Sequence, residues 1–298
     1  MAEPTDLQAR QSIESVTTTA NSAITLNANN RAVVELDPDH PGFRDEAYRE
    51  RRNQIAQIAI DYVPGSPIPD APYVDAEHLV WQEVCRKLAP AHDKWACKEY
   101  KEASMLLGLP TDRLPQLNEV SENLTRLSGF RLEPAGGLVD PKVFMSTLSE
   151  NIFLATQYIR HPSTPMYTPE PDVVHELIGH AVMLSSPLFA EINRLVGQAA
   201  LRCNSEEEIE RLGRIYWFSI EFGVALEDGS PKAYGAGLLS SSGELENLAN
   251  VELRPFDLTE IEASSYDVTV YQPFLFCAES SHALFFQLRE HLKNWGHH

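Results

Sequence analysis

The chain has 298 residues, with 43 acidic and 24 basic side chains and a formal net charge of −19 at pH 7. This length suits one large domain or two small ones, and the acidic balance disfavours binding to nucleic acids or anionic membranes, which requires basic patches. The sequence contains no run of 18 apolar residues that could span a membrane and no secretory start, so we expect a cytoplasmic protein.

The cysteines, Cys85, Cys97, Cys203 and Cys277, are spread along the chain without a C-x-x-C pair. This spacing argues against a disulfide framework and against a structural zinc site. No internal repeat is evident.

The first half of the chain is predicted to be an unstructured extension followed by helices. Residues 1–33 are rich in Thr, Ser, Ala and Asn and show little hydrophobic periodicity, which is typical of disorder. Helical periodicity then predicts helices over residues 45–62, 75–89, 93–107 and 114–127.

Helical patterns continue to the end of the sequence. A glycine-containing loop at 129–139 precedes a helix predicted over 141–158, whose proline stands in the first turn, where a missing N–H costs little. Later helices are predicted over 187–201, from Ser205 onwards and over 279–295, with a loop at 232–244 and strand-like residues at 268–271. The pattern predicts a mainly α fold of packed helices with a few short strands.

The stretch His175-Glu176-Leu177-Ile178-Gly179-His180 places two histidines five residues apart. Downstream, Glu221 continues an apolar helical stretch, where a carboxylate is costly unless a partner such as a metal compensates it. Two neutral imidazoles and one carboxylate are a ligand set for non-haem Fe(II), which leaves positions open for oxygen, and also for catalytic zinc.

The spacing distinguishes this stretch from the zinc-protease motif H-E-x-x-H, whose histidines lie four residues apart on one helix face. At about 100° per residue, a separation of five turns the second ring roughly 140° past one full turn. The rings of His175 and His180 converge on one metal only if the helix ends or distorts between them, and we expect this at Gly179. The alternative is two unrelated histidines near a helix end.

The sequence around these residues resembles the pterin-dependent aromatic amino acid hydroxylases. The similarity extends from about residue 34 nearly to the C-terminus and is carried by residues 35–43, 129–132, 157–161, 165–172, 175–180, 216–223 and 232–241. It implies a single catalytic domain over residues 34–298 and a monooxygenase that uses Fe(II) and tetrahydrobiopterin or another tetrahydropterin. In this resemblance His175, His180 and Glu221 hold the iron.

The resemblance also assigns a pterin site to Gly137, Val139, Phe144, Glu176 and Tyr216. A flat pterin stacks well on an aromatic ring, and backbone amides can bind its polar edge. Glu176 is expected to contribute to catalysis and would face the pterin rather than bind the iron. Without the resemblance, core packing would be the simpler explanation of Phe144, and a solvated helix carboxylate that of Glu176.

Two residues near this site depart from the animal members of the family. Pro141 stands where they have serine, and Leu154 stands where they have histidine near the pterin. Both departures affect what can be inferred about cofactor affinity and about the ring position that is hydroxylated.

A substrate site follows from the same resemblance. Arg160 would bind the substrate carboxylate through its fork of donors, and Trp217 is expected to contribute to catalysis as well as to ring binding. The remaining residues assigned to the substrate site are Thr168, Pro171, Phe222, Ser240 and Val268. Taken alone, Arg160 would more simply be a surface arginine at a helix end, and Trp217 and Phe222 would be core residues.

The expected reaction is hydroxylation of L-phenylalanine at the 4-position. Tryptophan-acting relatives tend to carry phenylalanine in place of Trp217, and tyrosine-acting relatives have an acid in place of Val268. Hydroxylation at the 3-position, giving meta-tyrosine, is the nearest alternative because of Leu154 and the unusual segment His180–Leu184; tyrosine 3-hydroxylation ranks lower.

Two alternatives come from other classes of protein. A zinc hydrolase would use the same three ligands without pterin, and a catalytically inactive binding protein would turn over no aromatic amino acid. The chain ends before the apolar helix that tetramerises the animal members, so we expect a monomer or a dimer whose partners are small molecules.

Overall fold

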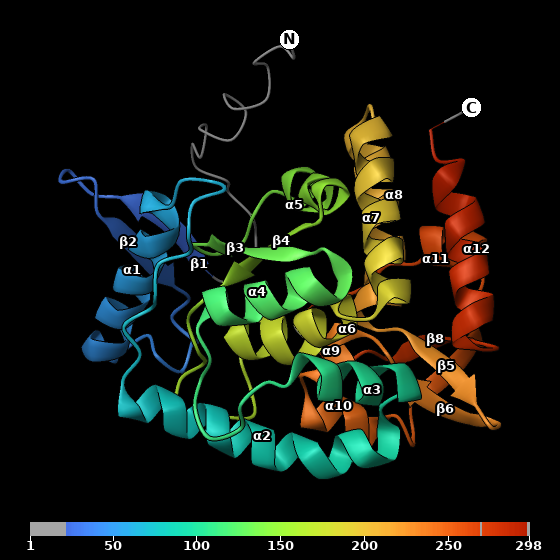
Figure 1. Ribbon diagram of the computed structural model, residues 1–298, viewed down its shortest axis with the longest axis horizontal. Helices are drawn as coiled ribbons and strands as arrows, with labels where there is room; N and C mark the ends of the chain where they lie inside the picture. The colour runs from blue at the N-terminus through green and yellow to red at the C-terminus, as the bar shows by residue number, and fades with distance from the viewer. Residues whose placement is uncertain (1–21, 269, 297–298) are drawn as a thin grey trace.

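The computed structural model describes residues 22–268 and 270–296, and within them helices predominate over short strands (Figure 1). This confirms the expected mainly α fold. The helices are α1 (Glu46–Asp61), α2 (Asp75–Trp95), α3 (Lys98–Leu107), α4 (Leu117–Ser128), α5 (Pro141–Thr147), α6 (Val182–Leu184), α7 (Pro187–Arg202), α8 (Glu206–Tyr216), α9 (Ala236–Leu239), α10 (Ser242–Asn247), α11 (Leu258–Ala263) and α12 (Ser281–Lys293). The strands are β1 (Ser22–Leu26), β2 (Ala32–Leu36), β3 (Arg131–Ala135), β4 (Ile152–Thr156), β5 (Val224–Glu227), β6 (Ser230–Ala233), β7 (Glu252–Pro255) and β8 (Phe274–Ala278).

Helix α7 lies at the centre of the hydrophobic core. Its sequence is apolar on most sides, and residues such as Phe189, Ile192 and Val196 are buried; each such side chain stabilises the fold by about 1.5–3 kcal/mol. Helices α5 and α12 pack against it. At Gly197 a Cβ atom would lie 2.1 Å from the Ser149 backbone nitrogen, so glycine is required for the turn after α5 to pack here.

Two small sheets frame the central helices. Strands β3 and β4 pair in parallel, with Arg131 opposite Ile152 and Ala135 opposite Thr156, and α5 forms the crossover between them, as parallel pairing requires. The second is a mixed sheet of order β6-β5-β8-β7. The end of β4 leads towards the helix that carries His175 and His180.

A buried ion pair fixes α1 against the loop that precedes this helix. Arg52 Nη2 lies 3.1 Å from Glu170 Oε2, and both side chains are buried. The Arg52 guanidinium lies 3.4 Å from the centre of the Tyr158 ring, a cation–π contact that is strengthened where water is excluded. The N-terminal part of the fold therefore supports the segment that leads to His175.

Part of the segment that was predicted to be an unstructured extension is folded. Residues 1–21 lie outside the described residues, but residues 22–36 form an antiparallel hairpin in which Ile24 pairs with Val34. Ala32, Val34 and Leu36 pack on Ala56 of α1. This alternation of apolar residues in β2 is a strand signal that the polar composition of residues 27–31 obscured.

Four other predicted segments were wrong. The helix expected over 141–158 ends at Thr147, because Asn151 adopts a left-handed conformation (φ 60°) and residues 152–156 then pair with β3. Helix α2 continues through Pro90 to Trp95. Residues 232–244 contain β6, α9 and α10, and the described residues of 268–271 form a turn and a bend rather than a strand.

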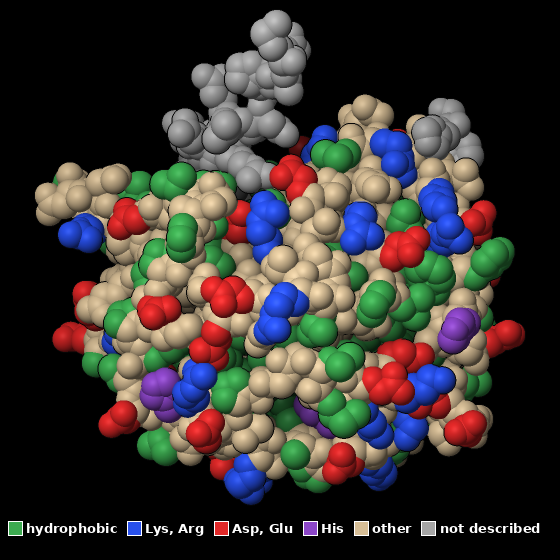
Figure 2. Space-filling model, viewed as in Figure 1, with side chains coloured by type: hydrophobic (Ala, Val, Ile, Leu, Met, Phe, Trp, Pro, Cys, Tyr) green, Lys and Arg blue, Asp and Glu red, His purple; other side chains and the backbone are tan. Residues whose placement is uncertain are grey.

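No helix in the described ranges is both long and apolar enough to cross a bilayer. On the face shown in Figure 2, acidic and basic side chains are interspersed and no broad basic patch is present.

Candidate active site

His175 and His180 lie on a π-helix, His175–Ala181. A π-helix closes its hydrogen bonds five residues along the chain, so side chains five apart lie on the same face. The expected helix distortion is therefore present, but it extends over the whole turn and is not a break at Gly179. The role of Gly179 is different: a Cβ there would lie 2.7 Å from the Ala236 carbonyl oxygen, so glycine allows α9 to approach the metal-binding helix.

Glu221 stands at the end of a second π-helix, Trp217–Glu221, which continues α8. The Phe222 N–H donates to the Trp217 carbonyl oxygen at 2.9 Å, a bond that spans five residues. Ser205 caps α8, and Leu212, Ile215 and Tyr216 are its buried residues, which fixes the orientation of the helix that leads to Glu221.

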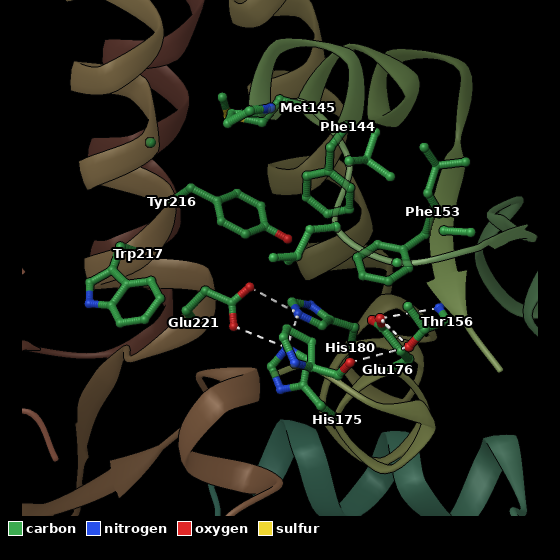
Figure 3. Close-up of a pocket in the computed structure, with 18 of the residues that line it drawn as sticks. Phe144, Met145, Phe153, Thr156, His175, Glu176, His180, Tyr216, Trp217 and Glu221 are labelled. Carbon is green, nitrogen blue, oxygen red and sulfur yellow. Dashed lines mark hydrogen bonds and ion pairs between the residues drawn. The ribbon is translucent and has the colours of Figure 1, made fainter. Parts of the chain in front are cut away.

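The structure brings the three predicted ligands together (Figure 3). The Nε2 atoms of His175 and His180 lie 3.0 Å apart. Glu221 Oε1 lies 3.0 Å from His180 Nε2, and Glu221 Oε2 lies 3.4 Å from His175 Nε2. Ligands at about 2.1 Å from a first-row metal on one face of an octahedron are about 3 Å apart, so this donor set fits a single metal ion.

Burial and the contacts among the three ligands determine their protonation states in the metal-free protein. Burial lowers the pKa of His175 to about 4, so its ring is neutral at pH 7. Burial also opposes charge on His180 and Glu221, but the ion pair between them is stronger: the pKa of His180 is raised and that of Glu221 is lowered. Binding of a divalent metal would therefore displace the proton that His180 holds against Glu221.

Ser240 determines which nitrogen of His175 faces the metal position. The Ser240 hydroxyl donates to the Ala236 carbonyl oxygen at 2.8 Å, and its oxygen lies 3.0 Å from His175 Nδ1. With its hydrogen committed to Ala236, Ser240 accepts the Nδ1–H of His175, which leaves Nε2 unprotonated. Such an outer partner fixes the tautomer and the ring orientation of a metal ligand.

Replacing Ser240 with alanine is expected to weaken iron binding by about 10–100-fold, because the Nδ1–H of His175 loses its acceptor. Titration of the metal-free protein with Fe(II) measures this change. Ser241→Ala is the matched control, since the Ser241 side chain caps α10; equal affinities in the two variants would contradict the role of Ser240.

Arg160 is paired with Asp172 and is not among the residues that line the cavity beside the metal ligands. Its Nε and Nη2 atoms donate to the two carboxylate oxygens of Asp172 at 2.9 and 2.7 Å, and both side chains are buried. Asp172 Oδ1 also accepts the His175 backbone N–H at 3.3 Å. The predicted carboxylate-binding arginine is therefore linked to the first metal ligand through one acid.

The Glu176 side chain faces β4 rather than the three metal ligands. Its Oε1 atom accepts bonds from the backbone N–H and the hydroxyl of Thr156, each at 3.2 Å (Figure 3). Burial raises the pKa of Glu176 to about 7. Glu176 lines the cavity but lies outside the group of three possible metal ligands.

A cavity of about 240 Å³ opens beside the three ligands. The predicted residues that line it are Gly137, Val139, Phe144, Pro171, His175, Glu176, His180, Tyr216, Trp217 and Glu221. Predicted residues that do not line it are Arg160, Thr168, Phe222, Ser240 and Val268. Phe222 packs on Trp217 with ring centres 4.5 Å apart, whereas Val268 is 52% exposed.

Several residues that contact the site were not predicted. Thr156 fixes Glu176, Asp172 joins Arg160 to His175, and Tyr266 stacks on Trp217 with ring centres 4.3 Å apart. Asp172 lies within the stretch that carried the family resemblance, so that stretch could have indicated it. No local pattern marks Thr156 or Tyr266.

Two histidines and one carboxylate on one face of a metal position, beside an aromatic cavity, define the class of mononuclear non-haem metal proteins. A family model described as biopterin-dependent aromatic amino acid hydroxylase matches residues 20–297. The chain belongs to this family.

Among curated relatives, tyrosine 3-monooxygenase of Bos taurus is 46% identical over 252 residues and phenylalanine-4-hydroxylase of Homo sapiens is 45% identical over 253 residues, and each match covers 83% of this chain. These matches cover 51% and 56% of the relatives, so the chain spans about half of their length. Phenylalanine 3-hydroxylase of Streptomyces coeruleorubidus is 42% identical over 241 residues, which cover 81% of this chain and 86% of that protein.

Solved structures share the fold. The phenylalanine hydroxylase of Colwellia psychrerythraea 34H superimposes with a TM-score of 0.72 at 31% identity, covering 79% of this chain and 92% of that chain. The phenylalanine hydroxylase of Chromobacterium violaceum, in a structure with bound iron(III) and 7,8-dihydrobiopterin, gives a TM-score of 0.71 at 29% identity, covering 76% and 84% of the two chains.

Proposed function

We propose that this chain is an Fe(II)- and tetrahydropterin-dependent monooxygenase that hydroxylates the ring of L-phenylalanine at the 4-position to give tyrosine. The observation that carries the proposal is the convergence of His175, His180 and Glu221 at the wall of an aromatic cavity. Bound iron and tetrahydropterin supply the oxygen chemistry: the pterin gives two electrons, one oxygen atom enters the aromatic ring and the other leaves on the pterin.

The pterin would lie against Phe144. The Phe144 ring is held edge-on by Phe153 and Tyr216, with ring centres 5.4 and 5.8 Å away. Gly137 and Val139 line the same part of the cavity, and Glu176 offers a carboxylate that Thr156 holds in place. These residues bind and orient the cofactor.

Tyr216 carries a buried hydroxyl that suits a bound ligand. Its oxygen has no hydrogen-bond partner within the described chain, and it points into the cavity towards His180 (Figure 3). Burial raises the pKa of Tyr216 well above its usual range, so the hydroxyl stays protonated and can donate. A buried donor without a partner costs about 1–3 kcal/mol, which a polar group of the cofactor would recover.

Replacing Tyr216 with phenylalanine is expected to make the ligand-free protein more stable by about 1 kcal/mol, because an unpaired hydroxyl is removed. The same change is expected to raise KM for tetrahydropterin about fivefold. Thermal unfolding and steady-state kinetics measure the two effects. A loss of stability together with an unchanged KM would contradict a ligand-directed hydroxyl.

The substrate carboxylate would bind near Arg160, and the ring would lie between Pro171 and Trp217. Arg160 has its Nε and Nη2 atoms on Asp172, which leaves Nη1 for a second carboxylate. Apart from Glu176 and Glu221, no acidic side chain of the described residues lines the cavity, so an unsubstituted ring is favoured over one that bears a hydroxyl.

Product chromatography tests the proposal. The chain is incubated with Fe(II), tetrahydropterin, O₂ and L-phenylalanine, and the products are separated. We expect para-tyrosine; meta-tyrosine would identify a 3-hydroxylase, which the similarity to the Streptomyces enzyme favours as the second candidate. Hydroxylation of tyrosine but not of phenylalanine, or pterin-independent activity with zinc, would overturn the proposal.

A further inference from the structure

The segment between α11 and β8 presents unusually apolar side chains to solvent. Tyr266, Val268, Val270 and Tyr271 are between 41% and 59% exposed. We call residues 266–271 the flap; it is described except for residue 269. The flap adjoins the cavity, because Tyr266 is one of the cavity residues.

Gln272 follows the flap and is buried, with 3% of its surface exposed. Its side-chain nitrogen donates to the carbonyl oxygens of Asp267 and Val270, at 3.0 and 3.1 Å. These two bonds connect Gln272, at the end of the flap, to two backbone carbonyl groups within the flap. The backbone N–H of Gln272 donates to Glu244 Oε1 of α10 at 3.2 Å, so the base of the flap is tied to a second element.

The side-chain oxygen of Gln272 accepts the indole N–H of Trp217 at 3.1 Å. The same indole stacks on Tyr266, with ring centres 4.3 Å apart and planes inclined by 11°. Trp217 lies beside Glu221 on the side of the cavity opposite Phe144 and Phe153 (Figure 3). The side-chain amide of Gln272 therefore holds Trp217, which forms this wall of the cavity, and also the flap, whose Tyr266 stacks on Trp217.

We propose that Gln272 is a positioning residue that sets where the substrate ring lies relative to the metal ligands. This inference rests on the proposed function and extends it to the control of ring position. The indole has a single donor, so its bond to Gln272 fixes the rotation of the ring that the substrate contacts. Without that bond, Trp217 and Tyr266 can move together and the aromatic substrate loses a defined wall.

The groups that contact Gln272 indicate that it positions Trp217 and takes no part in the reaction itself. Gln272 is neutral, and its contacts are backbone carbonyls, an indole and the Glu244 carboxylate. Gln272 does not line the cavity, and it does not belong to the group of possible metal ligands. Its replacement should therefore leave iron binding and pterin binding unchanged.

The test uses Gln272→Met, which keeps the length of the side chain and removes both polar atoms. The iron-loaded chain is assayed with tetrahydropterin and phenylalanine, and phenylalanine binding is also measured by calorimetry without pterin and without oxygen. Losing one buried hydrogen bond at the wall corresponds to about a tenfold loss of phenylalanine affinity. We also expect more pterin oxidised per hydroxylated product and a mixture of ring positions.

Gln116→Met is the matched control. Gln116 also joins two segments through one amide, since it accepts the Ala71 N–H and donates to the Ala71 carbonyl oxygen at 2.9 and 3.0 Å, but it does not line the cavity. Its replacement should lower the unfolding temperature without changing phenylalanine affinity or product distribution.

The outcomes separate this inference from the proposed function. If the unaltered chain hydroxylates phenylalanine but Gln272→Met keeps its affinity, its coupling and its product distribution, the positioning role is overturned. The same conclusion follows if Gln272→Met and Gln116→Met shift these quantities alike. If the unaltered chain binds phenylalanine but hydroxylates no aromatic amino acid, the proposed function fails. Calorimetry with Gln272→Met then still tests whether Gln272 positions the Trp217 ring for phenylalanine binding.

Discussion

His180→Ala is expected to abolish stoichiometric iron binding and, with it, hydroxylation. Loss of a residue that only orients a ligand already weakens metal binding by about 10–100-fold, so loss of a ligand should exceed about 100-fold. Metal analysis after equilibration with Fe(II) and dialysis measures the bound iron. Circular dichroism checks that the fold remains, because His180 also packs on Phe153, with ring centres 4.6 Å apart.

Thermal unfolding gives a second measurement on the same variant. A metal that binds only the folded state raises the unfolding temperature in proportion to the logarithm of its concentration. Added Fe(II) should therefore stabilise the unaltered chain and leave His180→Ala unchanged. His282→Ala serves as the control, since His282 is exposed on α12. Full iron content in His180→Ala would refute the ligand assignment.

Asp172→Ala is expected to lower the free energy of unfolding by about 3–5 kcal/mol, because it leaves the buried Arg160 guanidinium without its counter-charge. It also removes the acceptor of the His175 backbone N–H. Urea denaturation of the metal-free protein measures the loss. Asp172→Asn keeps one acceptor for Arg160, so its free energy of unfolding should lie between those of the unaltered chain and Asp172→Ala.

An exposed ion pair provides the comparison for Asp172. Arg86 and Glu83 lie on the surface of α2, 2.6 Å apart and with 64% and 38% of their side chains exposed, so Glu83→Ala should change stability by less than about 0.5 kcal/mol. A loss below about 1 kcal/mol in Asp172→Ala would show that Arg160 finds another partner or that water reaches it.

Local patterns in the sequence were sufficient to identify the long helices. The bounds of α1, α7 and α12 agree closely with the apolar periodicity, because each of these helices buries one face or more in the core. The helix predicted over 141–158 was wrong because residues 152–156 pair with β3, twenty-one positions earlier in the chain. Strand pairing between residues far apart in the sequence overrides the local helix preference. The local sequence of the segment does not reveal such a pairing.

The ligands of the candidate site were indicated by residue type and by the family resemblance, but their geometry was not. Five-residue spacing argued against an ordinary helix, and the π-helix that resolves this conflict depends on the surrounding packing. The contacts of Ser240, Thr156 and Gln272 join residues 20 to 65 positions apart, so no local pattern reveals them. The resemblance placed Ser240 with the substrate, whereas its contact in the structure is His175.

The close approach of α9 at Gly179 restricts how this protein can diversify. The backbone of Ala236 occupies the space that any larger side chain at Gly179 would need, and the same short helix leads to Ser240. That flank of the metal-binding helix has no room for a change in side-chain size. New substrate preferences are therefore expected to arise among residues that line the cavity but are not metal ligands, such as Leu154 and Met145.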